Sequence, residues 1–340
     1  MGKYYSEKVQ RDTQYRANFL AGIEAFLSSE QRKATERREA FMSPRAFKEN
    51  PEFFRAKFVE MLGFPLNQPR EMPTVTKSFV TRDGNADIYR MEFTFANGLY
   101  FYGLYFEQTE DPEDKPFFFG IHGGAGTSEL VSSIYYDSSN YNHMVRRITD
   151  KGASAFVPQL LLWNIRDYGN EYDRLIVDGK LRQLGGCITA LEVYMMQCAL
   201  DHFLANEKVN EEKVGVCGMS YGGMYALHLA AADTRFKACY SSSWICDIFQ
   251  WVKPDWSYQN AQNLLATAQT AALIVPRPLV VAMGTSDGYY KLGADAEAEK
   301  ILPYFEALGK EENFKYVTYD AGHAIDLGDE EIDFFLNALK

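Results

Sequence analysis

The chain has 340 residues, a net charge of −11 and an isoelectric point near 5.1. This acidic balance argues against nucleic acid or an anionic membrane surface as partner, because neutralising phosphates requires clustered lysine and arginine. An apolar fraction of 46% and a charged fraction of 24% are typical of a globular protein with one large core.

Neither a signal peptide nor a membrane span is indicated by the hydropathy pattern. The first twenty residues contain no apolar core of signal-peptide length, and no run reaches the roughly 18 apolar residues of a membrane span. We therefore expect a cytoplasmic protein. Its five cysteines lack metal-ligand spacing and mostly lie in apolar surroundings, which favours free buried thiols and no metal site.

A helical N-terminal extension is predicted over residues 1–70. Apolar positions such as Phe19, Ile23 and Phe26 recur there at helical spacing, and Asn50 is a suitable N-cap for a second helix. These apolar stripes must be covered either by the rest of the chain or by a second subunit, so a homo-oligomer is one of two open alternatives. If these helices pack beside the aromatic stretch at residues 244–256, they would form a wall of the substrate pocket.

Strands alternating with helices are predicted for the rest of the chain. Three alternating runs between residues 74 and 108, separated by Asp-Gly and Asn-Gly turns, indicate antiparallel hairpins. The later runs are short and continuously apolar, which indicates a mostly parallel sheet with helices on both faces. These runs cover residues 117–121, 153–157, 214–219, 236–240, 278–283 and 314–319.

The stretch from Val214 to Gly223 reads as a buried strand, a tight turn and a helix, with Ser220 in the turn. A serine in such a turn is lifted above the sheet edge, and the residues two before and two after it must be small. Gly218 and Gly222 meet this requirement. The alternative is a plain glycine-rich turn, but the strand and helix on either side favour a catalytic nucleophile.

Two further polar residues follow later strands and complete a candidate triad. Asp287 comes just after the strand at 278–283, and His323 just after the strand at 314–319. The order serine, aspartate, histidine, each past a strand, is the order of the α/β-hydrolases. Asp320 and Asp326 flank the histidine as alternatives, although a carboxylate so near in sequence seldom reaches the far ring nitrogen.

On these motifs, the chain resembles α/β-hydrolases of the dienelactone hydrolase and acetyl xylan esterase-like branch over residues 74–340. The resemblance implies an α/β-hydrolase catalytic domain over residues 71–340, with a cap-like insertion around 244–272. It implies that Ser220 is the nucleophile, His323 the base and Asp287 the residue that orients the base. Serine stands where dienelactone hydrolases carry cysteine, which favours ordinary ester cleavage over lactone hydrolysis.

The oxyanion donors are expected to be backbone amides, because they must point to where negative charge develops. Tyr221 follows the nucleophile and supplies one donor. Gly123 or Gly124, in the glycine loop after the strand at 117–121, supplies the other. Tyr221 also occupies the position where the related glucuronoyl esterases place an arginine, which argues against glucuronoyl esterase activity.

Aromatic residues are the main clue to the substrate. Trp163, Trp244 and Trp251 are candidate substrate-binding residues, since aromatic faces suit sugar rings or aromatic acids. Burial of a cap against the core is an equally good interpretation. Arg166 and Asp167 could likewise contact substrate or pair with each other. No phosphate loop, dinucleotide fingerprint or metal cluster appears in the sequence, so no cofactor is implied.

We therefore predict a serine carboxylesterase that cleaves a small-molecule ester. The acyl part of this ester is an acetyl or other short group, and a carbohydrate is one candidate for its alcohol part. A serine peptidase of the prolyl-oligopeptidase type is a second hypothesis, although that group normally carries a β-propeller in front. A catalytically dead hydrolase fold retained as a binding module is the third, because fold does not guarantee function.

Overall fold

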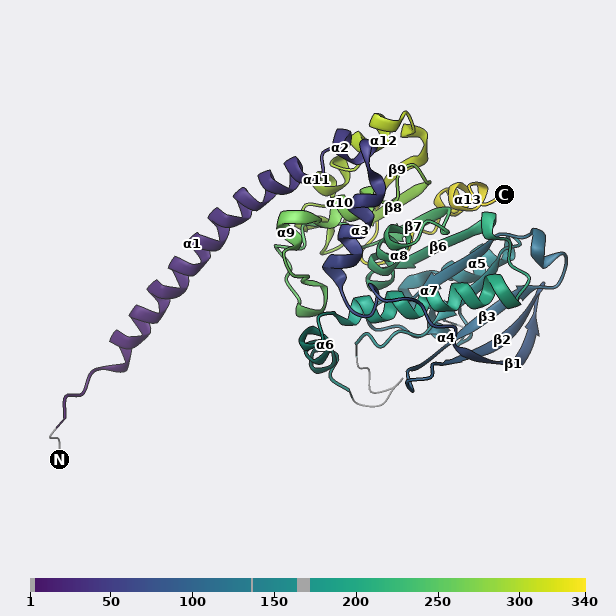
Figure 1. The fold of residues 1–340 in the computed structure, drawn as a ribbon, viewed down its shortest axis with the longest axis horizontal. Helices are drawn as coiled ribbons and strands as arrows, with labels where there is room; N and C mark the ends of the chain where they lie inside the picture. The colour runs from purple at the N-terminus through teal and green to yellow at the C-terminus, as the bar shows by residue number, and fades with distance from the viewer. Residues whose placement is uncertain (1–3, 136, 164–171) are drawn as a thin grey trace.

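One nine-stranded sheet organises the computed structural model, which describes residues 4–135, 137–163 and 172–340 (Figure 1). The strand order is β1-β2-β3-β5-β4-β6-β7-β8-β9. The pairs β1–β2, β2–β3 and β3–β5 are antiparallel, and all later pairs in this order are parallel. This confirms the predicted antiparallel edge on a mostly parallel sheet. The strands are β1 Thr74–Asp83, β2 Ala86–Thr94, β3 Tyr100–Gln108, β4 Phe117–Ile121, β5 Ser154–Pro158, β6 Val214–Met219, β7 Ala238–Ser242, β8 Leu279–Gly284 and β9 Phe314–Tyr319.

Helices cover both faces of this sheet, as the sequence predicts. Helix α8 packs on β6 and β7 from one side, while α13 packs on β7 and β8, and α5 on β5, from the other. The helices are α1 Val9–Phe41, α2 Pro44–Glu49, α3 Pro51–Leu62, α4 Ser128–Val131, α5 Met144–Asp150, α6 Arg174–Gln183, α7 Ile188–Asn206, α8 Tyr221–Ala232, α9 Ala261–Leu264, α10 Thr267–Ala272, α11 Ala294–Glu299, α12 Leu302–Leu308 and α13 Glu330–Asn337.

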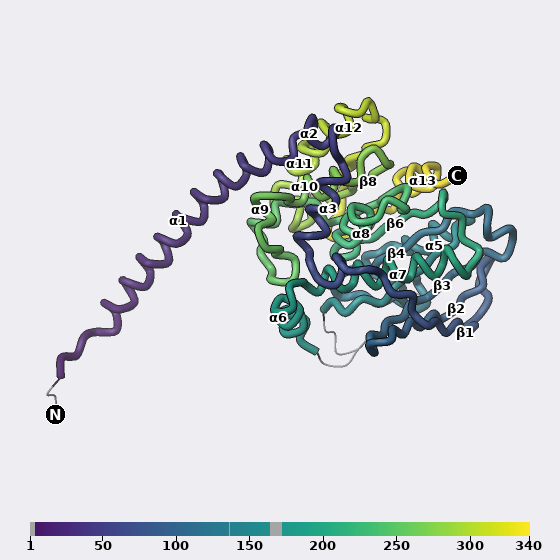
Figure 2. The backbone as a smooth tube through the Cα atoms, in the orientation of Figure 1, coloured from purple at the N-terminus to yellow at the C-terminus, as the bar shows by residue number. Residues whose placement is uncertain are grey.

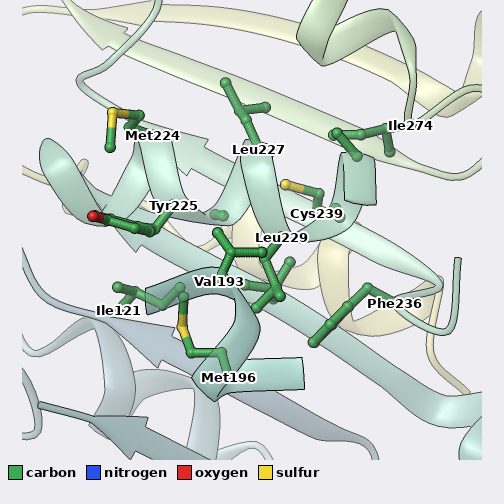
Figure 3. Packing of buried hydrophobic residues seen from close by; sticks show 14 of the residues in the cluster. Ile121, Val193, Met196, Met224, Tyr225, Leu227, Leu229, Phe236, Cys239 and Ile274 are labelled. Atoms are coloured by element: carbon green, nitrogen blue, oxygen red, sulfur yellow. The ribbon is translucent and has the colours of Figure 1, made fainter. Parts of the chain in front are cut away.

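The period of two along each strand divides the core into two layers. In β4, Phe117, Phe119 and Ile121 enter the layer beneath α7 and α8, whereas Phe118 enters the opposite layer. Figure 3 shows the first layer from close by, where side chains of α7, α8 and the sheet meet. Because both faces of the parallel strands are buried, these strands read as continuous apolar runs rather than alternating ones.

Helix α1 differs from the other helices because most of it projects away from the body of the protein (Figures 1 and 2). Its C-terminal end does contact the chain, with Arg37 Nε donating to Asn263 Oδ1 at 2.7 Å and Arg38 Nη1 donating to the Gln262 carbonyl at 2.6 Å. The apolar side chains before that end are exposed; they are Val9, Tyr15, Phe19, Leu20, Ile23, Phe26 and Leu27. The described remainder of the chain therefore does not cover this stripe, and contact between two copies stays a prediction.

The helices α2 and α3 are docked on the body, unlike most of α1. Asn50 caps α3 as predicted, its Oδ1 accepting the Phe53 amide at 3.2 Å, and Gly63 ends the helix. Phe54 and Phe58 are buried in the main core, and Arg55 Nη1 donates to the Leu273 carbonyl at 2.6 Å. The extension thus contributes apolar surface to the same core as the sheet.

Two further predictions from the sequence concern the cysteines and membrane-spanning helices. The structure confirms five free, buried thiols, at Cys187, Cys198, Cys217, Cys239 and Cys246. Across the parts of the chain that the structure describes, no helix combines the length and the apolar character needed to cross a membrane.

His228 on α8 links three parts of the fold. Its Nδ1–H donates to the Met224 carbonyl at 2.7 Å, and its ring packs on Phe58 of α3 and on Tyr258. Burial lowers the pKa of His228 from 6.5 to about 4, because the charged imidazolium would lose its hydration.

Acidification should therefore destabilise the protein through this residue. The unfolded chain binds the proton first as the pH falls, so the stabilisation is complete above pH 6.5 and lost between about 6.5 and 4, by roughly 3 kcal/mol at most. Urea unfolding at several pH values should show a smaller loss in His228→Gln, whose amide still donates to Met224. Equal pH slopes in the wild type and the variant would exclude this contribution.

Candidate active site

Ser220 stands between β6 and α8 in a backbone conformation that L-residues rarely adopt, with φ 61° and ψ −124°. Its amide donates to the Ser242 carbonyl at 2.9 Å and its carbonyl accepts the Met224 amide at 3.0 Å, so both sides of the turn are fixed. A non-glycine residue held in this region costs of order 1–3 kcal/mol, which the surrounding structure must offset. Such strain is typical of a functional site.

Two glycines make this turn sterically feasible. A Cβ on Gly218 would lie 2.2 Å from the Gly222 carbonyl oxygen, and a Cβ on Gly222 would lie 2.0 Å from the Ile121 carbonyl oxygen. No side chain fits at either position. The small residues expected on either side of Ser220 are therefore required by backbone contacts with each other and with the end of β4.

His323 and Asp287 are brought together by the loops that follow β9 and β8. The distance from His323 Nδ1 to Asp287 Oδ2 is 2.7 Å, while Asp287 Oδ1 accepts the Tyr289 amide at 3.0 Å. The Asp287 side chain is 1% exposed and that of His323 is 34% exposed. A buried carboxylate thus holds one ring nitrogen, and the imidazole is left at the surface of the cavity described next.

Ser220, His323 and Asp287 line one cavity of about 370 Å³, together with Gly123 and Gly124. The cavity lies beyond the C-terminal ends of the parallel strands, where open α/β sheets bind their ligands. Its remaining lining is mostly apolar or aromatic and comprises Ala125, Leu130, Ser139, Asn140, Tyr141, Trp163, Met219, Trp251, Gly288 and Tyr289. The cavity therefore unites the predicted triad with the predicted glycine loop.

The glycine loop differs in one respect from the expected oxyanion donors. The Gly123 amide already donates to Tyr141 Oη at 2.6 Å, so this N–H is occupied. The Gly124 carbonyl accepts the Trp163 amide at 2.8 Å, whereas neither the Gly124 nor the Tyr221 amide donates to a residue that the structure describes. The prediction was Tyr221 together with either Gly123 or Gly124, and of these amides those of Gly124 and Tyr221 remain available.

The side chain of Tyr221 belongs to a buried polar network. Its hydroxyl donates to Asp255 Oδ2 at 2.8 Å and accepts from Trp163 Nε1 at 3.3 Å. Arg174 pairs with two carboxylates of this region, its Nε lying 2.8 Å from Asp255 Oδ2 and its Nη2 3.1 Å from Glu192 Oε2. Burial raises the pKa of Tyr221, so the phenol stays protonated. This network fixes Tyr221, the residue after the serine. Through Asp255 it also connects the insertion around residues 244–272 to α6, α7 and α8.

The three predicted substrate-binding tryptophans fall into two groups. Trp163 and Trp251 line the cavity and are 45% and 40% exposed. Trp244 is only 3% exposed and is not among the residues that line it; its ring packs on Tyr221, Trp256 and Tyr289 instead. The interpretation of Trp244 as cap burial is the one the structure favours.

The N-terminal helices and the pair Arg166 and Asp167 were the other features expected near the substrate. The N-terminal helices do not wall the cavity, since its described lining begins at Gly123. Arg166 and Asp167 lie outside the described residues.

The segment η2 Ser139–Tyr141 was not predicted from the sequence. Asn140 Nδ2 donates to the His323 carbonyl at 2.8 Å, and its own carbonyl accepts the Ile325 amide at 2.9 Å. These bonds attach the segment that carries Tyr141 to the loop that carries the histidine. Tyr289, also missed, has its ring 5.3 Å from that of His323. No motif in the sequence marks these residues, because their roles arise from contacts between distant loops.

A sequence model of the dienelactone hydrolase family matches residues 133–327, more than half of the chain. The chain belongs to the dienelactone hydrolase family. The matched segment contains Ser220, Asp287 and His323 and places the chain among hydrolases. The candidate hydrolase YtaP of Bacillus subtilis (strain 168) is 23% identical over 230 residues, which is 64% of this chain and 75% of YtaP.

Solved structures of esterases share the fold of this family member. A candidate acetyl xylan esterase (BF1801) from Bacteroides fragilis NCTC 9343 matches with a TM-score of 0.67 and 15% identity, covering 87% of this chain and 84% of its own. A glucuronoyl esterase from Solibacter usitatus matches with a TM-score of 0.65 and 15% identity, covering 88% and 94%. At such low identity these matches show the α/β-hydrolase fold.

The bond between Asp287 and His323 leads to a prediction about which carboxylate matters. Asp287→Asn should lower kcat of ester hydrolysis by roughly 10³- to 10⁴-fold, because an amide favours the wrong histidine tautomer. Asp326→Asn is the matched control, since Asp326 Oδ2 accepts the Gly328 amide instead. Asp320→Asn is a second control, and the three variants are compared by their esterase kinetics. If either control lost more activity than Asp287→Asn, the role of Asp287 would pass to that residue.

Proposed function

We propose that this protein is a serine carboxylesterase in which Ser220 is the nucleophile, His323 the general base and Asp287 the residue that orients the base. The observation that carries the proposal is the shared cavity, in which a strained serine meets a histidine already bonded to a buried carboxylate. A serine hydroxyl alone is a weak nucleophile, and activation by an oriented base in the same site is the general solution.

The proposed reaction has two halves. Ser220 Oγ attacks the ester carbonyl while its proton passes to His323 Nε2, and the resulting imidazolium is stabilised by Asp287. That proton then goes to the leaving alcohol as the carbon–oxygen bond breaks, leaving an acyl group on Ser220. Water, deprotonated by the same histidine, attacks the acyl-enzyme. The bond between the acyl carbon and Ser220 Oγ then breaks, the proton on His323 passes to Ser220 Oγ, and the acid is released.

The substrate we propose is a neutral ester with an acetyl or other short acyl group. Apart from Asp287 and His323, the described lining of the cavity contains no acidic or basic residue. Trp163 and Trp251 are partly exposed in the cavity, and a sugar ring could stack on their aromatic side chains. The fold shared with acetyl xylan esterase-type proteins supports an alcohol part that is a carbohydrate.

Removing the Ser220 hydroxyl tests this function. Ser220→Ala should lower kcat/KM for p-nitrophenyl acetate by roughly 10⁴-fold or more, because the acyl-enzyme cannot form. Circular dichroism should show an unchanged fold, and Ser78→Ala on the exposed edge strand β1 serves as the matched serine-to-alanine control. Substantial acetate hydrolysis by a folded Ser220→Ala would remove the serine from the mechanism.

A further inference from the structure

The hydroxyl of Tyr141 is placed at the centre of the glycine loop. It accepts the Gly123 amide at 2.6 Å, and the residue is only 3% exposed although it lines the active-site cavity. A phenol has one proton and two lone pairs. One lone pair is used by Gly123, and no described residue accepts the proton of Tyr141 Oη. A buried donor without a partner is costly unless a ligand or water completes it.

We propose that Tyr141 is a catalytic residue whose Oη–H donates to the oxyanion of the tetrahedral intermediate, as a side-chain member of the oxyanion hole. This inference rests on the proposed esterase function and extends it. The predicted amide of Gly123 then acts indirectly. By donating to Tyr141 it holds the hydroxyl in place, while Gly124 and Tyr221 supply backbone donors.

The glycine contacts show that this hydroxyl and the nucleophile face the same space. A Cβ built on Gly123 would lie 3.1 Å from Tyr141 Oη and 3.2 Å from Ser220 Cβ. Both atoms therefore border the same small space beside Gly123, as does the Met219 carbonyl oxygen at 3.2 Å. A carbonyl carbon attacked by Ser220 Oγ would bring its oxygen into this region, where a donor about 3 Å away is the requirement for an oxyanion hole.

The electrostatic state of the phenol suits a donor. Burial raises the pKa of Tyr141, so the hydroxyl keeps its proton across the neutral range. Because the oxygen accepts a bond from Gly123, polarisation along the chain strengthens the bond that its own proton makes. In the reaction the Tyr141 proton is shared and not transferred. The Ser220 proton moves to His323, and the carbonyl π electrons move to the oxygen.

The position of Tyr141 is tied to the base as well as to the nucleophile. Its neighbour Asn140 is bonded to the His323 carbonyl and to the Ile325 amide. The segment that carries the proposed donor and the loop that carries the base therefore form one unit. This arrangement would limit reorganisation when the charge develops, which is the condition for strong electrostatic stabilisation.

Removing this hydroxyl is the direct test. Tyr141→Phe should lower kcat for p-nitrophenyl acetate by roughly 10- to 10³-fold with little change in KM. An aryl trifluoromethyl ketone, which Ser220 converts to a tetrahedral oxyanion, should lose affinity by a similar factor. Tyr105→Phe is the matched control, because the Tyr105 hydroxyl is buried in the core without a hydrogen-bond partner. The control should keep wild-type kcat and inhibitor affinity.

A second variant displaces the hydroxyl without removing it. A Cβ on Gly126 would lie 2.2 Å from Tyr141 Oη, so Gly126→Ala should push the oxygen away and reproduce the loss in kcat. This variant decides the matter if Tyr141→Phe does not fold. Wild-type kcat and ketone affinity in a folded Tyr141→Phe would overturn the proposal. If the wild type is active and Ser220→Ala inactive in the same experiment, the esterase assignment survives that result.

Discussion

The close approach of backbone at the end of β6 is the constraint on which the rest of the site depends. Gly218, Gly222 and the Ile121 carbonyl are too near one another for any side chain, and this contact turns the chain sharply enough to hold Ser220 at φ 61°. The same turn starts α8, whose free N-terminal amides favour negative charge beside the serine. One packing constraint therefore creates both the exposed nucleophile and part of the environment for its oxyanion.

Parallel strand order brings the other groups to this turn. The loops after β4, β6, β8 and β9 all emerge at one edge of the sheet, so the glycine loop, Ser220, Asp287 and His323 meet although they are far apart in sequence. Buried polar groups then fix them. Asp287 holds the histidine, and the pair of Arg174 with Asp255 holds Tyr221. Breaking such buried pairs leaves an uncompensated charge and is strongly destabilising.

Much of this could be predicted from the sequence, because strand and helix periodicities and the position of polar residues after strands are local signals. The sheet, both kinds of pairing and the cap at Asn50 follow from such signals. The bond from Gly123 to Tyr141 could not be predicted, since it depends on how a loop folds back over the glycines. The burial of Trp244 and the exposure of the α1 stripe, with Phe19 its most exposed phenylalanine, likewise depend on tertiary packing.

In the proposed mechanism Ser220 carries the acyl group during turnover, and the other roles in the site depend on this. Treating the enzyme with a fluorophosphonate, digesting it and measuring peptide masses tests this claim most directly, because the reagent traps an activated serine covalently. We expect one adduct, located on the peptide that contains Ser220. Labelling should be lost in Asp287→Asn, and an acetyl ester should protect the serine from it. Labelling of another serine at the same rate, or no labelling of an enzyme that hydrolyses esters, would contradict it.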